Sequence, residues 1–341
     1  MKEEERAAAW NRKSEAASRL ARDRMDELRW PERFAAAAAY MAALPAKDRY
    51  SREELLAEPL LLSREGPLAI YYAPHNELAA PEARLVLAGL TPGWRQMELS
   101  LRTMRACLAA GASPAEACRQ ARRAARFAGP MRAGLLDMLE RLGLPEALDA
   151  AFVRSDAPPH GSAANPPPGP SPARAASTPQ SAASAGSDRP QLDRHPASAA
   201  PPRPDEADRS LLDHPLVHTT SVLPCPAFRD GENYSGHQPP LRRSPLLWET
   251  AMRHMEDELV RLRQPALLLP LGKAAEEAAS ELVRRGLLPE ERLLRGFPHP
   301  SGANGHRFVQ FERAFPEIKD RLDRFFEQER AVVPPKTIKE E

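Results

Sequence analysis

The stretch "LVLAGLTPG", residues 85–93, decides the fold that the sequence predicts. Four apolar residues run into a glycine, and a Thr-Pro-Gly turn ends the run. A short apolar run bounded by turn residues is typical of a strand that is buried on both faces. Strands are buried in this way when helices cover both faces of a parallel sheet. The stretch therefore predicts a central strand that ends in a loop over residues 89–94.

Other segments extend this prediction along the chain. Residues 215–228 are β-branched and apolar and indicate a strand that runs into a loop, residues 265–272 indicate a buried strand, and residues 68–77 begin with a short extended element. Amphipathic or capped helices are predicted over 95–110, from Ser113 onward, within 126–144, and over 245–263, 273–286 and 307–327. Alternating strands and helices predict a three-layer α/β/α fold, with a central, mostly parallel sheet of about four strands.

The composition divides the chain into an ordered domain and a proline-rich insertion. Residues 155–210 hold 13 of the 37 prolines and Leu192 as the single large apolar residue. Such a segment cannot bury enough apolar surface to offset the entropy of ordering. We therefore expect residues 61–154 and 211–330 to form one domain, 1–60 to form helices that pack on it, 155–210 to be a disordered insertion, and 331–341 to be a tail.

Charge and cysteine content exclude several classes of protein. The 341 residues carry a net charge of +1, and the three cysteines have no metal-ligand spacing. The N-terminus is charged, and the longest apolar run, residues 34–44, is too short to span a bilayer. We therefore expect a cytoplasmic monomer that needs no membrane, metal or cofactor.

Three loops compete for the functional site. Ligands of open parallel sheets bind beyond the carboxyl ends of the strands. The loops over 89–94, 221–238 and 298–306 each follow a predicted strand, so they should meet at one edge of the sheet. The last loop belongs to "GFPHPSGANGHR", residues 296–307, which combines two histidines with three glycines.

Taken together, these loops resemble the uracil-DNA glycosylase superfamily. The turn Gly-Leu-Thr-Pro-Gly at 89–93 resembles the first motif of that family, and "FAGPMRAGLLDMLERLGL" at 127–144 resembles its phenylalanine followed by a leucine-rich helix. Thr-Ser-Val-Leu at 220–223 resembles its middle strand, and His-Pro-Ser at 299–301 resembles its last motif. The resemblance covers residues 66–325 without the insertion. It implies a DNA glycosylase that flips a base out of DNA and hydrolyses its bond to deoxyribose.

The resemblance also implies roles for individual residues. His299 would donate a hydrogen bond to an oxygen of the departing base or to a flanking phosphate, and Phe127 would stack on that base. Backbone amides of residues 89–93 would donate hydrogen bonds as well. The remaining base-binding candidates are Gly89, Leu90 and Ser221, and the DNA-binding candidates are Pro92, Gly93, Ser301, Asn304 and Arg307.

The sequence departs from the family pattern at two positions. Thr91 stands where relatives often carry a water-orienting Asp or Asn, and a hydroxyl cannot act as a carboxylate base. We keep Thr91 as a catalytic candidate that holds water, with Asp230 as a compensating acid and Glu232 as its alternative. A plain surface turn is the competing interpretation of the loop that carries both acids. Ser221 stands where relatives read uracil with an asparagine amide, so it should open the pocket.

The closest pattern is that of the iron–sulfur branch of the family, which binds its cluster through four cysteines. Cys225 stands where one ligand could fall, and the other three are missing, so no cluster is expected.

Three functions remain open at this point. The first is excision of a bulky modified pyrimidine, for example from phage DNA in antiviral defence. The second is ordinary uracil repair. In the third, Thr91 and Ser221 mark a lapsed active site, and the protein is a DNA-binding module.

Overall fold

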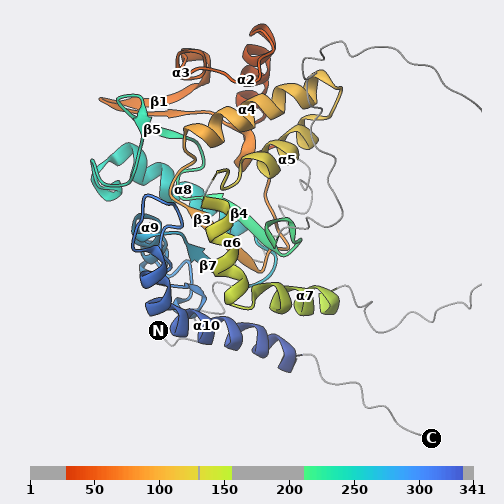
Figure 1. Ribbon diagram of the computed structural model, residues 1–341, viewed down its shortest axis with the longest axis vertical. Coiled ribbons are helices and arrows are strands. Elements are labelled where there is room, and N and C mark those ends of the chain that lie inside the picture. Colours follow the sequence, from red (N-terminus) through yellow and green to blue (C-terminus); the bar gives the residue numbers. More distant parts are fainter. Residues whose placement is uncertain (1–27, 130, 156–210, 333–341) are drawn as a thin grey trace, which may run out of the picture. The chain divides into compact units, whose positions relative to one another are not determined.

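The structure is a computed structural model that describes residues 28–129, 131–155 and 211–332 (Figure 1). The described residues before and after the gap at 156–210 belong to one compact unit. The predicted insertion from residue 156 onward, the tail from residue 333 onward and the first 27 residues lie outside the described ranges.

A three-stranded parallel sheet lies at the centre of this unit. Strand β3 (Leu85–Gly89) lies between β4 (Val217–Ser221) and β7 (Leu267–Pro270). The register pairs Gly89 with Ser221 and Ala88 with Pro270, so the three strands end side by side. A single parallel bridge joins Leu293 to Leu268 at the outer edge of β7. The predicted mixed α/β fold with a parallel sheet is confirmed at this level.

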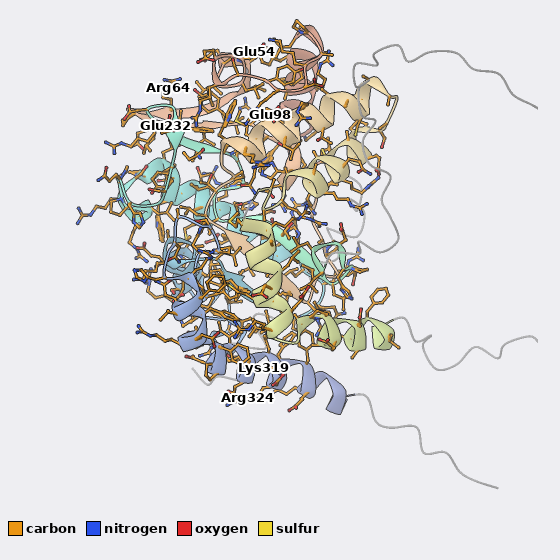
Figure 2. The ribbon with its side chains drawn as sticks, viewed as in Figure 1. Glu54, Arg64, Glu98, Glu232, Lys319 and Arg324 are labelled. Atoms are coloured by element: carbon orange, nitrogen blue, oxygen red, sulfur yellow. The ribbon has the colours of Figure 1, made fainter. Side chains whose placement is uncertain are left out.

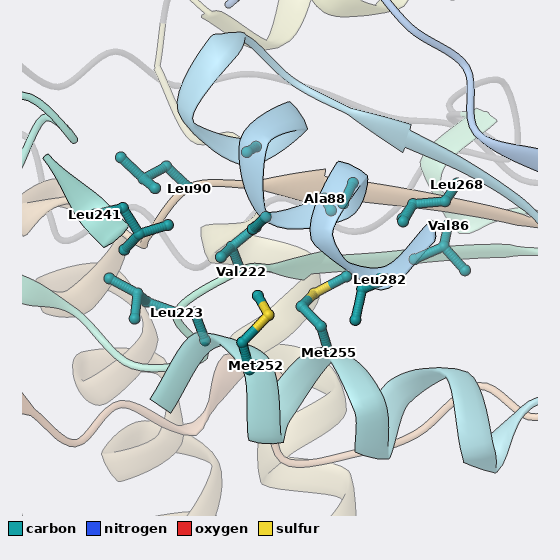
Figure 3. Close-up of a cluster of buried hydrophobic side chains, with 14 of the residues drawn as sticks. Val86, Ala88, Leu90, Val222, Leu223, Leu241, Met252, Met255, Leu268 and Leu282 are labelled. Atoms are coloured by element: carbon teal, nitrogen blue, oxygen red, sulfur yellow. The ribbon is translucent and has the colours of Figure 1, made fainter. Parts of the chain in front are cut away.

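Two groups of helices cover the two faces of this sheet. Because side chains alternate along a strand, Val86 and Ala88 face one core cluster, and Leu85 and Leu87 face another. The first cluster includes buried residues of α8 (Pro245–Arg261) and α9 (Lys273–Arg284). Figure 3 shows this cluster, with Met252 and Met255 of α8 pointing toward the strands.

The second face is covered by α6 (Met131–Arg141), α7 (Leu144–Ser155) and α10 (Arg307–Val332). Helix α10 extends beyond residue 327, where the sequence predicts its end. Its outer side is charged: Lys319 pairs with Asp323, and Arg324 pairs with Asp320 (Figure 2). The apolar side of α10 therefore packs on the sheet, and the charged side faces solvent.

A third core cluster joins the N-terminal helices to the rest of the unit. Helices α2 (Pro31–Ala43) and α3 (Arg52–Leu55) contribute buried side chains that meet those of α4 (Trp94–Ala109) and α5 (Pro114–Ala125). The Ser113 hydroxyl accepts a hydrogen bond from the Glu116 amide, as the predicted start of α5 requires.

A second, antiparallel sheet was not predicted. It contains β1 (Leu61–Glu65), β2 (Leu68–Tyr71), β5 (Ala227–Arg229) and β6 (Glu232–Asn233), in that order. The strand and the following loop predicted within 215–228 are confirmed by β4, but the end of this range belongs to the additional strand β5. The loop after β4 crosses to the second sheet, where residues 227–229 pair with β2.

None of the helices in the described ranges is long and apolar enough to cross a membrane.

Candidate active site

The ends of β3 and β4 bring three predicted base-binding residues together. A Cβ atom at Gly89 would lie 3.6 Å from the Ser221 Oγ and 4.0 Å from the Phe127 Cε1. Backbone hydrogen bonds extend this contact beyond the strands, because the amides of Val222 and Leu223 donate to the carbonyls of Gly89 and Leu90 at 2.8 Å. Gly89, Ser221 and Phe127 therefore surround one point at the edge of the sheet.

Phe127 has a backbone conformation that sequence patterns do not reveal. Its φ angle is +51°, which is rare for a bulky residue and is often found at functional sites. The preceding residue holds the turn, since the Arg126 guanidinium donates to the carbonyl of Leu212 and to the carboxylate of Asp213. The Phe127 side chain is part of the core, and only 5% of the residue is exposed. The ring therefore approaches Gly89 from a buried position.

The loop after β3 is held by the protein itself. Leu90 and Pro92 are buried. The Gly93 amide donates to the Gln96 Oε1 at 3.0 Å, and the Trp94 amide donates to the Asn233 Oδ1 at 2.8 Å. The expectation that the Gly93 amide faces a ligand is therefore wrong, because the start of α4 is already capped by side chains.

The Thr91 hydroxyl forms two hydrogen bonds to the segment that follows β4. Its Oγ1 donates to the Cys225 carbonyl at 3.1 Å and accepts from the Ala227 amide at 3.0 Å. A hydroxyl has one proton, so Thr91 cannot also donate to a water molecule. These two contacts give Thr91 a structural role, because they tie the loop after β3 to the loop after β4, and one lone pair of the hydroxyl can still accept a hydrogen bond from water.

The predicted acid Asp230 lies in a hairpin turn. Its φ angle is +50°, its amide donates to the Pro67 carbonyl at 2.9 Å, and its carboxylate lies 3.7 Å from the Arg229 Nε. The alternative, Glu232, pairs with Arg52 at 3.3 Å and is 80% exposed. No hydrogen bond or ion pair among the described residues joins either acid to Thr91, Ser221 or His299. The surface-turn interpretation fits both acids.

His299 follows the bridged residue Leu293 and lies on the surface of its loop. Its Nδ1 accepts from the Ser301 amide at 3.3 Å and lies 3.0 Å from the Ser301 Oγ. An amide can only donate, so in the neutral ring the proton is on Nε2. The surrounding atoms desolvate the ring and lower the pKa of His299. The neutral imidazole therefore offers one N–H donor at Nε2.

The other residues of this loop hold His299 in place. The Asn304 side-chain amide donates to the His299 carbonyl at 3.2 Å and to the Gln310 Oε1 at 2.9 Å. Arg307 donates to the Asn304 carbonyl, and its guanidinium lies 4.5 Å from the centre of the Phe308 ring. Ser301 and Asn304 thus position the loop, and the half-buried Arg307 keeps donors that are not used in these contacts.

Gly272 connects the His299 loop to the end of β7. Its amide donates to the Phe297 carbonyl at 3.1 Å, and its φ angle is +95°. A Cβ atom at this position would lie 2.9 Å from the His299 Cβ and 3.3 Å from the His299 nitrogen. The loop therefore approaches the chain closely at a residue where only glycine fits without movement.

Four residues of this edge are not predicted from the sequence. Gly272 and the exposed Lys273 begin α9 beside His299. Asn233 caps α4, and the exposed Arg95 lies over Gly129, with its Nη1 3.3 Å from a Cβ placed there. Gly272 carries a sequence signal, since a glycine follows an apolar run there as Gly89 follows the apolar residues 85–88. The other three are recognised only after the loops are brought together.

No metal ligands gather at this edge. Groups of three or more His, Cys, Asp or Glu side chains able to hold a metal ion do not occur among the described residues. The Cys225 thiol is buried, and burial raises its pKa to about 12. A thiol in this state is a poor metal ligand.

These features define an α/β protein whose polar loops meet at the carboxyl ends of a parallel sheet. The chain is 34% identical over 275 residues to a Bacillus subtilis (strain 168) protein named "Uncharacterized protein YoxB", a match that covers 81% of this chain and 87% of that protein. The chain therefore belongs to the same family as YoxB. No protein-family model matches the chain. No solved structure matches it either.

Proposed function

We propose that this protein is a DNA glycosylase with the three-layer α/β/α architecture of the uracil-DNA glycosylase superfamily. The observation that carries the proposal is the convergence of four separate sequence segments at one edge of the sheet. Gly89, Phe127 and Ser221 surround one point, and His299 packs on Gly272 at the end of the neighbouring strand. Residues that are distant in sequence thus supply a hydrophobic ring, a small polar side chain and a neutral N–H donor.

These groups suit departure of a base from deoxyribose. The bond between C1′ and the base nitrogen breaks, and its electron pair leaves with the base, so the sugar becomes oxocarbenium-like and the base becomes anionic. The Nε2–H of His299 can donate a hydrogen bond to a base oxygen on which this negative charge develops. A neutral imidazole suffices for that role. Water then adds to C1′, and the proton that it loses neutralises the anionic base, which leaves an abasic site and the free base.

The surroundings of the site suit binding of a phosphate backbone. Arg95, Lys273 and Arg307 come from three elements next to the loops. Such contacts position DNA without reading its sequence. Phe308 and Val309 are 44% and 54% exposed at the start of α10, where apolar side chains can contact unstacked bases.

The proposed substrate is a pyrimidine with a bulky substituent. Ser221 is smaller than the asparagine that relatives use to read uracil, so the pocket should accept a larger base. Modified pyrimidines of phage DNA belong to this class, and their excision would serve defence. Uracil repair is the alternative that the same chemistry allows.

A second candidate, a DNA-binding module without catalysis, is favoured by the contacts of Thr91. Its hydroxyl braces the loop, and the predicted acids do not contact Thr91, Ser221 or His299. In this case the loops bind DNA, and no base is released.

The experiment that tests the proposal measures base release. The full-length protein is incubated with duplexes that carry uracil, 5-hydroxymethyluracil or thymine at one position, and alkali then cleaves abasic strands. We expect release of the substituted base, and a loss of about a hundredfold to a thousandfold in rate in His299→Ala. His306→Ala, an exposed histidine of the same segment, is the control and should retain the wild-type rate. Duplex binding without any base release would favour the binding module.

A further inference from the structure

A cavity of about 520 Å³ is present in addition to the candidate active site. Its walls come from residues 29–33, strands β1 and β2, residues 224–225 and helix α8. None of the residues assigned above to base or DNA binding lines it. The volume falls in the range of small-molecule sites.

The charges around the cavity are strongly unbalanced. Four arginines, Arg29, Arg33, Arg253 and Arg261, line it together with one carboxylate, Asp257. Asp257 pairs with Arg29 at 2.7 Å and with Arg261 at 2.9 Å. Arg33 and Arg253 are exposed at the cavity and form no hydrogen bond or ion pair within the described part of the chain. Two guanidinium groups are therefore available to a ligand.

Arg29 provides a further hydrogen-bond donor in the wall of the cavity. Its side chain is 2% exposed, and one of its terminal nitrogens pairs with Glu258 at 3.0 Å. Its Nε has no hydrogen-bond partner in the described structure. Buried donors without an acceptor are rare in folded proteins, so a ligand acceptor would complete this group.

A buried network fixes the wall behind Arg29. The His254 Nδ1 lies 3.3 Å from the Arg29 Nη1, which can only donate, so Nδ1 accepts and the ring proton is on Nε2. That proton points to the Thr220 Oγ1 at 3.1 Å, and the Thr220 hydroxyl donates to Glu258 at 2.9 Å. His254 is thus neutral, and the arginines supply the positive charge of the wall.

The remaining wall is aromatic and aliphatic. Trp30 and Tyr72 line the cavity with Leu62, Ile70 and Pro224. The Tyr72 hydroxyl donates to Glu77 at 2.6 Å, so its ring is held in place. A ligand that is complementary to both the arginine-rich wall and the aromatic wall needs negative charge at one end and a flat, weakly polar group at the other.

We propose that this cavity binds a free nucleoside diphosphate. Guanidinium forks match phosphate oxygens in pairs, and aromatic rings match the faces of a base. The proposal does not depend on glycosylase activity, since neither the residues nor the ligand belong to the active-site edge.

The test uses the full-length protein and ADP labelled with an N-methylanthraniloyl group, followed by energy transfer from tryptophan. We expect saturable binding, competition by unlabelled ADP, and at least tenfold weaker competition by inorganic phosphate and by a single-stranded oligothymidylate. Lack of binding at millimolar nucleotide would overturn the proposal. Equal competition by phosphate, or stronger competition by the oligonucleotide, would overturn the assignment to a free nucleotide.

Two variants localise the binding. Arg33→Ala with Arg253→Ala should weaken ADP binding at least tenfold, and both side chains are exposed, so the fold should persist. Arg49→Ala with Arg313→Ala removes the same charge from exposed positions outside the cavity and should leave binding unchanged. Trp30→Phe should remove most of the energy transfer but retain binding. Equal weakening by both double variants would show a general charge effect and contradict the site.

Discussion

Thr91 joins two loops that the sequence keeps far apart. Its hydroxyl donates to the Cys225 carbonyl and accepts from the Ala227 amide. Removing the hydroxyl leaves both backbone groups without this partner, and such a loss typically costs about 1–3 kcal/mol. We therefore predict that Thr91→Val lowers the free energy of unfolding in urea by about that amount, whereas Thr91→Ser retains most of it. Unchanged stability with base release reduced a hundredfold would instead indicate a catalytic Thr91.

Ser221 is the residue at which substrate choice should change. Its Oγ lies 3.6 Å from the Cβ position of Gly89, so a larger side chain would fill the space above that glycine. We predict that Ser221→Asn reduces release of 5-hydroxymethyluracil relative to uracil at least tenfold in single-turnover measurements, because the amide narrows the pocket and pairs with the pyrimidine edge. Ser221→Ala, which keeps the space, is the control. An unchanged ratio in Ser221→Asn would exclude this residue from the base pocket.

The sequence could predict residues whose neighbours along the chain define their role. The glycine turn at 89–93 ends β3, and the loop around His299 follows the residue Leu293, which is bridged to β7, so their place at the sheet edge could be inferred. The function of Thr91 could not be inferred, because its partners at 225 and 227 lie more than a hundred positions away. The position of Asp230 could not be inferred either, because its turn depends on the pairing of β5 with β6 and on the hydrogen bond of its amide to the Pro67 carbonyl.

At the scale of elements, the start of α9 supports the His299 loop. A Cβ at Gly272 would lie 2.9 Å from the His299 Cβ, and the φ angle of +95° also disfavours any other residue. We predict that Gly272→Ala displaces the loop, lowers stability and reduces base release more than tenfold. Gly66→Ala is the matched control, because Gly66 also has a positive φ angle but has no atom within 4 Å of its Cβ position. It should lower stability modestly and leave base release unchanged. Equal effects of both variants on base release would contradict the supporting role of Gly272.

The helices were predictable because their apolar residues recur with the helical period, and the parallel strands were predictable because they are short apolar or β-branched runs that end in turn residues. The second, antiparallel sheet could not be predicted in this way. A Gly-Pro turn at residues 66–67 separates β1 from β2, but the short strands β5 and β6 have no periodic pattern of their own. Their pairing is decided by where the loop after β4 emerges, which is a tertiary property.

At the scale of the whole molecule, buried histidines make stability depend on pH. Burial lowers the pKa of His75 and of His254 to about 3, and burial also lowers the pKa of His218. Burial opposes ionisation of Glu258, but the charge of Arg29 and its contact with His218 hold the pKa of Glu258 well below its usual range. In each case the unfolded chain binds more protons than the folded chain as the pH falls. Glu77, whose pKa burial raises, acts in the opposite direction.

The stability that these histidines contribute should therefore be fully present above about pH 7 and should be lost as the pH falls from about 6.5 to about 3. Each proton taken up on unfolding contributes about 1.4 kcal/mol per pH unit, so His75 and His254 together contribute about 2.8 kcal/mol per pH unit in this window. Urea unfolding at a series of pH values measures the slope. His75→Gln should reduce it by about 1.4 kcal/mol per pH unit, and His237→Gln, at an exposed position, should leave it unchanged. A slope that His75→Gln does not alter would mean that His75 is already protonated in the folded protein, against the desolvation that its buried position imposes.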